Sequence, residues 1–340
     1  MLTSRAVSTD ASALPANQLG GPHELQRLVS ALHEEYRTLD DGHVATYIPE
    51  LGRANPDHFG VSVVTADGRV FEAGDCEQPF TIQSISKPFV YGMAIEQLGQ
   101  DHVSRHVDVE PSGDAFNSIE LQNGTNRPHN PMVNSGAITV SALMHAHYGA
   151  DAFDHILSRF SAAAGRQLSI DESVYESERR TGHRNRAIAH LLLNFGMVPD
   201  DAQVALDVYF KQCSILVTCR DLAMMGATLA NMGRNPVTDA GVFDVRCVKD
   251  MLSIMFTCGM YDYSGQWAYR VGIPAKSGVG GGVLAVVNRQ VGIATYSPKL
   301  DSHGNSVRGV EVCAQLASRL GLHVFDCLNL GSSYLDTMLS

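Results

Sequence analysis

The feature that most constrains this sequence is the separation of its strand-forming runs. Apolar and β-branched runs typical of strands occupy residues 59–64 and 70–74, and similar runs return at 278–287 and 291–296. The stretch between them, about 84–267, has mostly helical periodicity broken by glycine and proline. Strands joined by tight turns must pair antiparallel, because a parallel pair needs a long crossover. We therefore expect an antiparallel sheet built from both ends of the chain, with a long helical insert.

Amphipathic helices are predicted at both ends of this arrangement, over residues 23–39 and 304–320, where leucines and valines recur at helical spacing. The expected fold class is α/β (α+β), with an antiparallel sheet flanked by helices and a helical lobe beside it. The predicted organisation is a loose N-terminal tail at 1–22, one catalytic domain at 23–325 and a C-terminal extension at 326–340. Within that domain the sheet is expected from about 59–76 and 272–300, and the helical lobe from about 84–267.

Composition excludes several classes of protein. A chain of 340 residues that is 44% hydrophobic can bury a large core, and a net charge of −11 argues against a nucleic-acid partner. Its seven cysteines form no CxxC pair, which disfavours a zinc site and a disulfide framework and suits a reducing cytoplasm. No run reaches the roughly 20 apolar residues of a spanning helix, and residues 1–22 lack the apolar core of a signal peptide. We expect a cytoplasmic protein without a membrane partner.

The first candidate for chemistry is the serine–lysine pair Ser84 and Lys87. Pro88 is tolerated in a first helical turn, so a helix is expected to begin close to Ser84, and residues three apart share one face of it. A partly desolvated lysine near the positive end of a helix has a lowered pKa and can take the proton of a serine hydroxyl. Such a short motif arises easily by chance, so the pair alone is weak evidence.

The second candidate is the sequence Lys276-Ser277-Gly278, which leads into Val279 and three further glycines. The order is wrong for a phosphate-binding loop, which needs glycines before the lysine. Glycines that open a strand let another backbone or a ligand come close. The N–H groups of Val279 and Ser84 could then both face a developing oxyanion. A glycine-bent edge strand without a catalytic role explains this segment equally well.

Serine–lysine, asparagine-rich and Lys-Ser-Gly motifs, in this chain order, resemble the serine β-lactamase and penicillin-binding superfamily. Within that superfamily the chain resembles the serine-dependent glutaminases much more closely, in their bacterial type. The matching blocks run in order over nearly the whole chain: 47–51 (YIPEL), 83–87 (QSISK), 110–113 (EPSG), 128–134 (PHNPMVN), 177–179 (SER), 184–185 (RN), 258–262 (CGMYD) and 274–279 (PAKSGV).

The resemblance implies a β-lactamase-like fold and the hydrolysis of L-glutamine to L-glutamate and ammonia, without cofactor or metal. It implies a homo-oligomer, a dimer or a tetramer, with the tetramer as the specific expectation. By position, Ser84 matches the nucleophile, Lys87 the activating base and Tyr261 a catalytic tyrosine. The positions that match substrate-binding residues are Tyr47, Gln83, Ser84, Asn134, Glu178, Asn185, Tyr209, Tyr261 and Val279, the last through its backbone.

These roles suit the chemistry of glutamine, which is a zwitterion with an amide tail. Its ammonium needs a carboxylate such as Glu178, and its carboxylate needs donors such as Asn134, Asn185 and tyrosine hydroxyls. The leaving ammonia needs a proton from Tyr261 or Lys87, and the division of acid and base roles between the two stays open.

One position departs from the expected pattern: His183 stands where many relatives are expected to have an acidic residue. We interpret it as a solvated residue at a helix end, and an effect on substrate affinity stays open. Two alternative functions stay open. The first is another acyl-serine enzyme, a β-lactamase or peptidase, which would work outside the cytoplasm. The second is a catalytically silent glutamine-binding or filament-forming module, which intact Ser84, Lys87 and Tyr261 disfavour.

Overall fold

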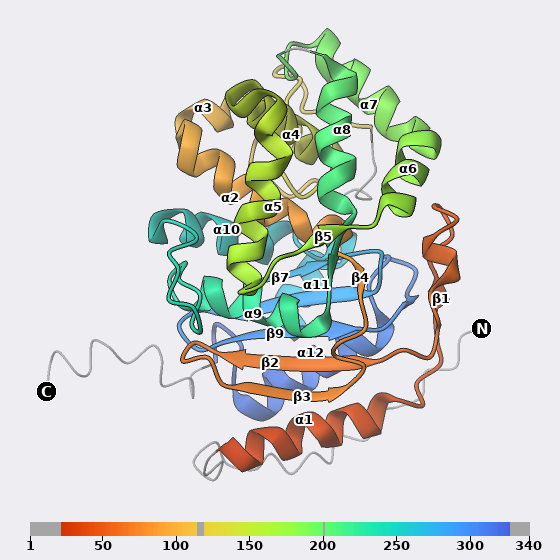
Figure 1. Ribbon diagram of the computed structural model, residues 1–340, viewed down its shortest axis with the longest axis vertical. Helices are drawn as coiled ribbons and strands as arrows, with labels where there is room; N and C mark the ends of the chain where they lie inside the picture. The colour runs from red at the N-terminus through yellow and green to blue at the C-terminus, as the bar shows by residue number, and fades with distance from the viewer. Residues whose placement is uncertain (1–21, 114–118, 200, 327–340) are drawn as a thin grey trace, which may run out of the picture.

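The computed structural model describes residues 22–113, 119–199 and 201–326. A five-stranded antiparallel sheet with helices on both faces lies beside a lobe of helices (Figure 1). The strands are β1 (His43–Val44), β2 (Gly60–Thr65), β3 (Val70–Gly74), β4 (Phe80–Thr81), β5 (Ser169–Ile170), β6 (Ile215–Val217), β7 (Ala275–Ser277), β8 (Gly282–Val287), β9 (Val291–Tyr296) and β10 (Lys299–Leu300). The helices are α1 (Pro22–Tyr36), α2 (Ser86–Leu98), α3 (Gln100–Ser104), α4 (Asn134–Tyr148), α5 (Ala152–Ala164), α6 (Glu172–Thr181), α7 (His183–Asn194), α8 (Ala202–Cys213), α9 (Cys219–Ala230), α10 (Val245–Cys258), α11 (Ser264–Arg270) and α12 (Val307–Leu320).

The main sheet combines strands from both ends of the chain, in the order β3-β2-β9-β8-β7. Strand β2 is the junction: Gly60 pairs with Gly74 of β3 on one side and with Tyr296 of β9 on the other, both antiparallel. This confirms the predicted antiparallel sheet and places the first hairpin beside strands that follow it by more than 200 residues.

One strand prediction was wrong in its first four residues. We expected a continuous strand over 278–287, but residues 278–281 form the turn between β7 and β8. The Gly278 N–H donates to Gly282 O at 3.0 Å, and Gly281 has φ of +98°, which only glycine adopts at low cost. Sequence periodicity did not separate a glycine-rich turn from a glycine-rich strand, because glycines supply no facing pattern.

The two faces of the sheet are covered by different helices (Figure 1). Helices α1 and α12 cover one face, with Val29, Leu32 and Val312 among the fully buried side chains. Helix α9 packs on the other face against β2, β8 and β9, and the helical lobe lies beyond it. The predicted terminal helices are both present but shorter, since α1 ends at Tyr36 and α12 begins at Val307. The Ser306 side chain caps α12 by accepting a hydrogen bond from the Gly309 N–H.

A second, small sheet in the order β4-β6-β5 joins the helical lobe to the main body. Phe80 of β4 pairs with Val217 of β6, and β4 leads directly into a 3-10 turn, η3 (Gln83–Ile85), and then into α2. This connection fixes the start of α2 at the junction between the lobe and the main sheet. Ser84 lies at that junction.

The ends of the chain are only partly described. The predicted tail at 1–22 and extension at 326–340 lie outside the described residues, apart from Pro22, which begins α1, and Asp326. Among the helices of the described part, none combines the length and the apolar character needed to cross a bilayer.

Candidate active site

Ser84 sits in the 3-10 turn η3, where β4 ends and α2 begins. Its side chain is buried, with 6% exposed. The preceding residue, Gln83, has φ of +49°, a left-handed conformation that is strained in a non-glycine residue and is concentrated at functional sites. Pro88 lies in the first turn of α2, so the helix starts where the sequence predicted. Local strain and the helix start together present Ser84 at the junction between the two parts of the fold.

Lys87 is one turn further along and is almost fully buried. Its Nζ donates to Asn134 Oδ1 at 2.7 Å and to the backbone oxygen of Met132 at 3.0 Å. Burial lowers the pKa of Lys87 to about 8, while Cys213 and Glu178 oppose this shift. The amine is therefore partly neutral near neutral pH, as a base acting on a serine requires.

Asn134 is the hub that joins three helices of the lobe to Lys87. Its Oδ1 also accepts a hydrogen bond from the Tyr209 hydroxyl of α8 at 3.2 Å, and its Nδ2 donates to Asn185 Oδ1 of α7 at 3.0 Å. Asn134 is the first residue of α4 and is buried. The Asn130 side chain fixes the approach to α4 by accepting from the Met132 and Val133 N–H groups at 3.0 and 3.2 Å.

Glu178 brings a buried carboxyl group to the same region from α6. Its side chain is 5% exposed, and burial raises its pKa to about 7, while the nearby positive charge of Lys87 lowers it. Buried carboxyl groups are costly unless they are paired or used. A carboxyl held here can neutralise a positively charged group of a ligand, which would pull its pKa back down.

Tyr261 approaches Ser84 from the main body, in the 3-10 turn η5 (Tyr261–Tyr263). Its hydroxyl donates to Ser277 O at 3.0 Å. Burial raises the pKa of Tyr261, and hydrogen bonds with the Ser84 side chain, Ser277 and the Val279 backbone act in the opposite direction. Like Gln83, Tyr261 has a positive φ, +58°. Two strained residues thus flank the serine, and the tyrosine hydroxyl links it to the turn that carries Val279.

The glycine turn after β7 packs directly against the segment that carries Ser84. A Cβ at Gly280 would lie 2.8 Å from Thr81 O, and one at Gly278 would lie 3.1 Å from Ile82 O. A side chain at either position would push the two backbones apart. The sequence interpretation that these glycines permit close approach is therefore supported, and the approaching group is the backbone of the serine segment.

Lys276 is a second fully buried lysine, whose side chain the sequence interpretation left without a role. Its Nζ donates to Ser277 O at 2.7 Å and to Gly259 O at 3.0 Å, and lies 4.4 Å from the centroid of the Tyr261 ring. Burial, and then the charge of Lys87, lower the pKa of Lys276. The Lys-Ser-Gly motif drew attention to this residue, but only the structure places it beside Tyr261.

Tyr47 contacts the segment that carries Ser84. Its side chain is 53% exposed, and its hydroxyl donates to Gln83 Oε1 at 3.1 Å. The Gln83 Nε2 in turn donates to Thr81 Oγ1 at 3.1 Å. Tyr47 also lines a groove of about 1110 Å³, together with Val279, Asp262 and His303. Through the contacts described above, the structure thus brings the predicted catalytic and substrate-binding residues to one region.

Two contributors gave no signal in the sequence. Met132 acts through its backbone oxygen, and any residue type could supply that group. Cys213 is buried in the same region, where burial raises the pKa of its thiol to about 12 and keeps it neutral, and it has no motif around it. His183, the departure noted in the sequence, is exposed at the first residue of α7.

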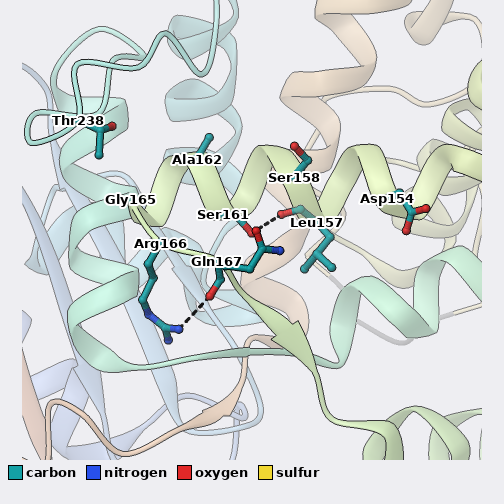
Figure 2. Close-up of a pocket in the computed structure, with 9 residues that line it drawn as sticks. All are labelled: Asp154, Leu157, Ser158, Ser161, Ala162, Gly165, Arg166, Gln167 and Thr238. Atoms are coloured by element: carbon teal, nitrogen blue, oxygen red, sulfur yellow. Dashed lines mark hydrogen bonds between the residues drawn. The ribbon is translucent and has the colours of Figure 1, made fainter.

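A separate pocket of about 510 Å³ lies along α5 and the segment that follows it (Figure 2). Its most polar group is Arg166, which donates to Gln167 O at 3.1 Å and forms an ion pair with Asp221 at 2.5 Å. Because Asp221 already satisfies the guanidinium, and none of the candidate site residues lines this pocket, we assign it no part in the site.

The fold and the site together define a class. An antiparallel sheet flanked by helices, with a serine and a lysine one turn apart where a helical lobe joins it, is the arrangement of β-lactamase-like proteins.

Comparison with known proteins identifies the family within this class. A family model described as Glutaminase matches residues 42–325. The chain is 53% identical over 309 residues to a glutaminase of Trichormus variabilis, covering 91% of this chain and 92% of that protein. It is 56% identical to glutaminase 2 of Bradyrhizobium diazoefficiens, covering 89% of this chain and 48% of that longer protein. The chain belongs to the glutaminase family.

Solved structures agree with this assignment. The probable glutaminase ybaS superposes with a TM-score of 0.87 at 41% identity, covering 90% of this chain and 99% of that one. Mglu in its glutamate form superposes with a TM-score of 0.85 at 41% identity, covering 90% and 71%. A probable glutaminase of Bacillus subtilis gives a TM-score of 0.81 at 35% identity, covering 88% and 97%.

Proposed function

We propose that this enzyme hydrolyses the side-chain amide of L-glutamine to L-glutamate and ammonia through an acyl-enzyme on Ser84. Membership of the glutaminase family supports the reaction. The observation that carries the mechanism is the placement of Ser84 between two groups that can move a proton. Lys87, with its pKa lowered to about 8, lies one turn along the helix, and the Tyr261 hydroxyl is hydrogen-bonded to the serine side chain.

The substrate is held at both ends of its amino-acid group. Glu178 is the buried carboxyl group that would pair with the substrate ammonium, which explains why a costly group is kept there. Asn185, Tyr209 and Tyr47 have amide or hydroxyl groups that can reach a carboxylate, and Asn134 orients the first two. The glutamate-bound structure of the relative Mglu supports an amino-acid site in this fold.

Chemistry then proceeds in two steps. Neutral Lys87 accepts the Ser84 proton, directly or through the Tyr261 hydroxyl, as the serine oxygen attacks the amide carbon. The resulting oxyanion accepts hydrogen bonds from the N–H groups of Ser84 and Val279. The protonated base gives its proton to the leaving ammonia. Water then attacks the glutamyl ester and releases glutamate. The lowered pKa of Lys87 favours the lysine as the first proton acceptor, with Tyr261 relaying the proton to the leaving group.

We further propose that residues 23–325 act as one catalytic domain in a cytoplasmic homo-oligomer, specifically a tetramer. The resemblance to glutaminases supports assembly as a dimer or tetramer, and the net charge of −11 suits a protein that stays soluble at high concentration. Light scattering coupled to size-exclusion chromatography tests the assembly, and a monomeric mass at micromolar concentration would refute it.

The decisive experiment is the Ser84→Ala variant, assayed for both glutamate and ammonia. We expect the rate to fall by at least about a thousandfold while the circular dichroism spectrum is unchanged, because the nucleophile is lost and little else is altered. Ser86→Ala is the matched control, because Ser86 is also buried, is the first residue of α2 and donates to Gln83 O. This variant should keep a measurable rate.

Residual activity above a few per cent in Ser84→Ala would remove this serine from the nucleophile role.

Asparagine should be a far poorer substrate than glutamine, because its shorter tail leaves the amide carbon out of reach of the serine. Binding of glutamine in calorimetry without ammonia release by the wild type would instead support a silent binding module.

A further inference from the structure

Two buried cysteines, Cys76 and Cys219, lie outside the candidate active-site residues and flank the small-sheet strands β4 and β6 in the chain. Cys76 lies in the loop between β3 and β4, and Cys219 is the first residue of α9. The backbone N–H of Arg220 donates to the backbone oxygen of Cys76 at 3.2 Å, so the two segments are in direct contact. The strand pair β4–β6 lies between these cysteines in the chain and ties the segments together, through Phe80 and Val217.

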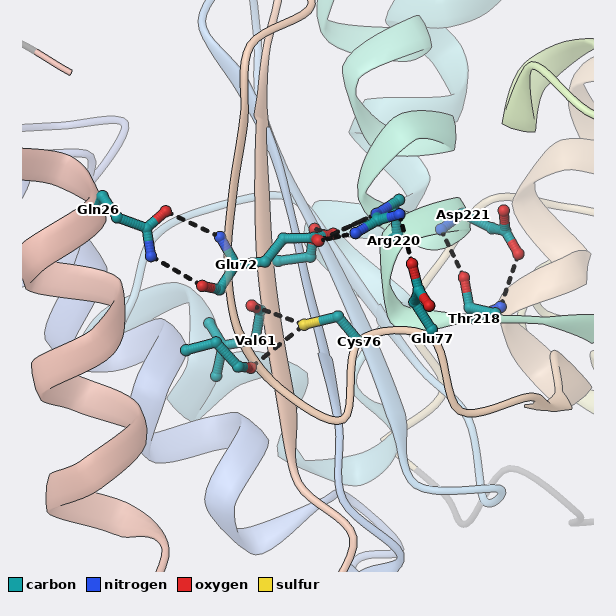
Figure 3. A network of polar contacts seen from close by, with 10 residues as sticks. Gln26, Val61, Glu72, Cys76, Glu77, Thr218, Arg220 and Asp221 are labelled. Atoms are coloured by element: carbon teal, nitrogen blue, oxygen red, sulfur yellow. Dashed lines mark hydrogen bonds and ion pairs between the residues drawn. The ribbon is translucent and has the colours of Figure 1, made fainter. Parts of the chain in front are cut away.

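Both thiols lie against backbone oxygens of the main sheet, and Figure 3 shows the contacts of Cys76. Cys76 Sγ lies 3.1 Å from the backbone oxygen of Val61 and 3.2 Å from that of Ala73, and its single S–H can donate to either. Cys219 Sγ donates to the backbone oxygen of Ala294 at 3.2 Å. Val61 of β2 and Ala294 of β9 belong to adjacent register pairs, Val61 with Thr295 and Ser62 with Ala294. The two sulfur atoms therefore converge on neighbouring positions of adjacent strands.

The thiols interact with each other as well. A hydrogen bond with Cys219 is the largest influence on the Cys76 thiol and lowers its pKa, against burial and the nearby carboxylate of Glu72. Burial raises the pKa of Cys219. A thiolate, not a thiol, is the nucleophile in thiol oxidation, so the two members of the pair are unequal.

The two cysteines also differ in access. Cys76 lines a shallow surface pocket of about 490 Å³ with Glu72, Glu77 and Arg220, although only 4% of its surface is exposed. Arg220 spans the pocket, donating to Glu72 at 2.9 Å and to Glu77 at 2.7 Å (Figure 3). Cys219 has no exposed surface. A small oxidant that enters this pocket would reach Cys76 before Cys219, because Cys219 does not line the pocket.

We propose that Cys76 and Cys219 form a redox pair that a hydroperoxide converts into a disulfide. The Cys76 thiolate attacks the outer oxygen of the hydroperoxide, giving Cys76 sulfenic acid and an alcohol, or water from hydrogen peroxide. The Cys219 sulfur then attacks the Cys76 sulfur, forming the disulfide and releasing water, with its proton completing that water. The peroxide receives the two electrons that the two thiols lose. A dithiol reductant reverses the change by thiol–disulfide exchange.

The cross-link would close a loop that contains the helical lobe from α2 to α8, because Cys76 precedes α2 and Cys219 follows β6. Closing so long a loop restrains the unfolded chain, so oxidation should raise the thermal unfolding temperature by several degrees, on the order of 5 °C. The pair lies outside the proposed catalytic machinery, so its test is independent of Ser84.

The test uses the full-length wild type, reduced, desalted and treated with a few equivalents of hydrogen peroxide. The protein is then denatured, alkylated and digested for mass spectrometry. We expect a linked peptide pair containing Cys76 and Cys219, a mass loss of two hydrogens relative to the reduced chain, and recovery of both thiols with dithiothreitol. Cys219→Ser should abolish the linked pair and leave a Cys76 sulfenic acid that dimedone traps.

Cys247→Ser is the matched control, because Cys247 lies outside the pair and is the most exposed cysteine of the described residues, with 9% of its surface exposed. This variant should form the Cys76–Cys219 link as the wild type does. In the wild type, alkylation of both Cys76 and Cys219 after a peroxide dose that oxidises Cys247 would overturn the proposal. So would a link formed equally well between either cysteine and another partner.

Discussion

The core beneath α1 and α12 and the core around Ser84 are equally well buried but use opposite chemistry. The first is filled by apolar side chains of the sheet and of the helices around it, such as Leu32 of α1, Trp267 of α11 and Val312 of α12. The second contains Lys87, Glu178 and Asn134, all with 8% or less of their surface exposed. The apolar side chains of the first core need only fill the available volume, whereas each polar group of the second needs a hydrogen-bonding or charged partner.

The difference indicates that the core around Ser84 stabilises the fold less than an apolar core would. In the core around Ser84, burial moves the pKa of Lys87 down to about 8 and that of Glu178 up to about 7, each towards the neutral form. Both shifts mean that the charged forms destabilise the folded state, and such groups are concentrated at functional sites. Substitutions in the two cores should therefore have opposite effects on stability and activity.

The largest expected effect comes from Lys87→Met, which keeps the length of the side chain and removes the amine. The catalytic rate should fall by about a thousandfold or more, because no base remains one turn from Ser84. At pH 6, where the Glu178 carboxyl is mostly protonated, the free energy of unfolding should change by less than about 2 kcal/mol. Ammonia release measures the catalytic rate, and urea unfolding measures the free energy of unfolding. Lys249→Met, at an exposed lysine of α10, is the control, and a tenfold or smaller loss in Lys87→Met would contradict the role.

The reverse result is expected for Leu32→Ala in the core beneath α1. Truncation of this fully buried side chain should lower the free energy of unfolding by about 2–4 kcal/mol, because a cavity is left between α1 and the sheet. The rate at 20 °C should stay within about twofold, because α1 supplies no site residue. Arg27→Ala, on the exposed side of the same helix, should change the stability by less than about 0.5 kcal/mol. Equal losses of activity in Leu32→Ala and Lys87→Met would remove the distinction between the cores.

A smaller kinetic effect is expected from Glu178→Gln. The Michaelis constant for glutamine should rise by about ten- to fiftyfold, because an ion pair to the substrate ammonium becomes a neutral hydrogen bond. The stability should not fall, since a buried carboxylate is replaced by a neutral amide of the same shape. Glu176→Gln is the control from the exposed side of α6, where Glu176 pairs with Arg179. An unchanged Michaelis constant in Glu178→Gln would place the ammonium elsewhere.

The smallest expected effect is a dependence of kcat/KM on pH. The value of kcat/KM should rise several-fold from pH 6 to pH 8.5, because Glu178 ionises as the pH passes about 7 and Lys87 becomes neutral as it passes about 8. In Glu178→Gln the lower of the two apparent pKa values should disappear and the upper should remain. Stability should follow the opposite logic at Glu178: its raised pKa means that stability is lost as the pH rises from about 4.5 to 7. A kcat/KM that is flat or falls over this range would be inconsistent with a neutral lysine base.

Much of the architecture could be predicted because it depends on local pattern. The β-branched runs around residues 60 and 290 predicted strands, and Pro88 predicted that α2 starts beside Ser84. Residues 278–281 were the exception, since a run of glycines has no alternation by which a turn and a strand can be distinguished. The candidate site residues could be named from their motifs, but their contacts could not.

The sequence by itself determined the periodicity of the helices, the antiparallel pairing of strands joined by short turns, and the spacing of Ser84 and Lys87, because each depends on residues close together in the chain. Only the tertiary structure decided which groups surround them. Lys87 meets Asn134 across 47 positions, and Asn134 meets Tyr209 across 75. The burial that shifts the pKa values of Lys87 and Glu178 comes from several elements at once, as does the meeting of Cys76 with Cys219. A property that is summed over distant parts of the chain exists only once the chain has folded.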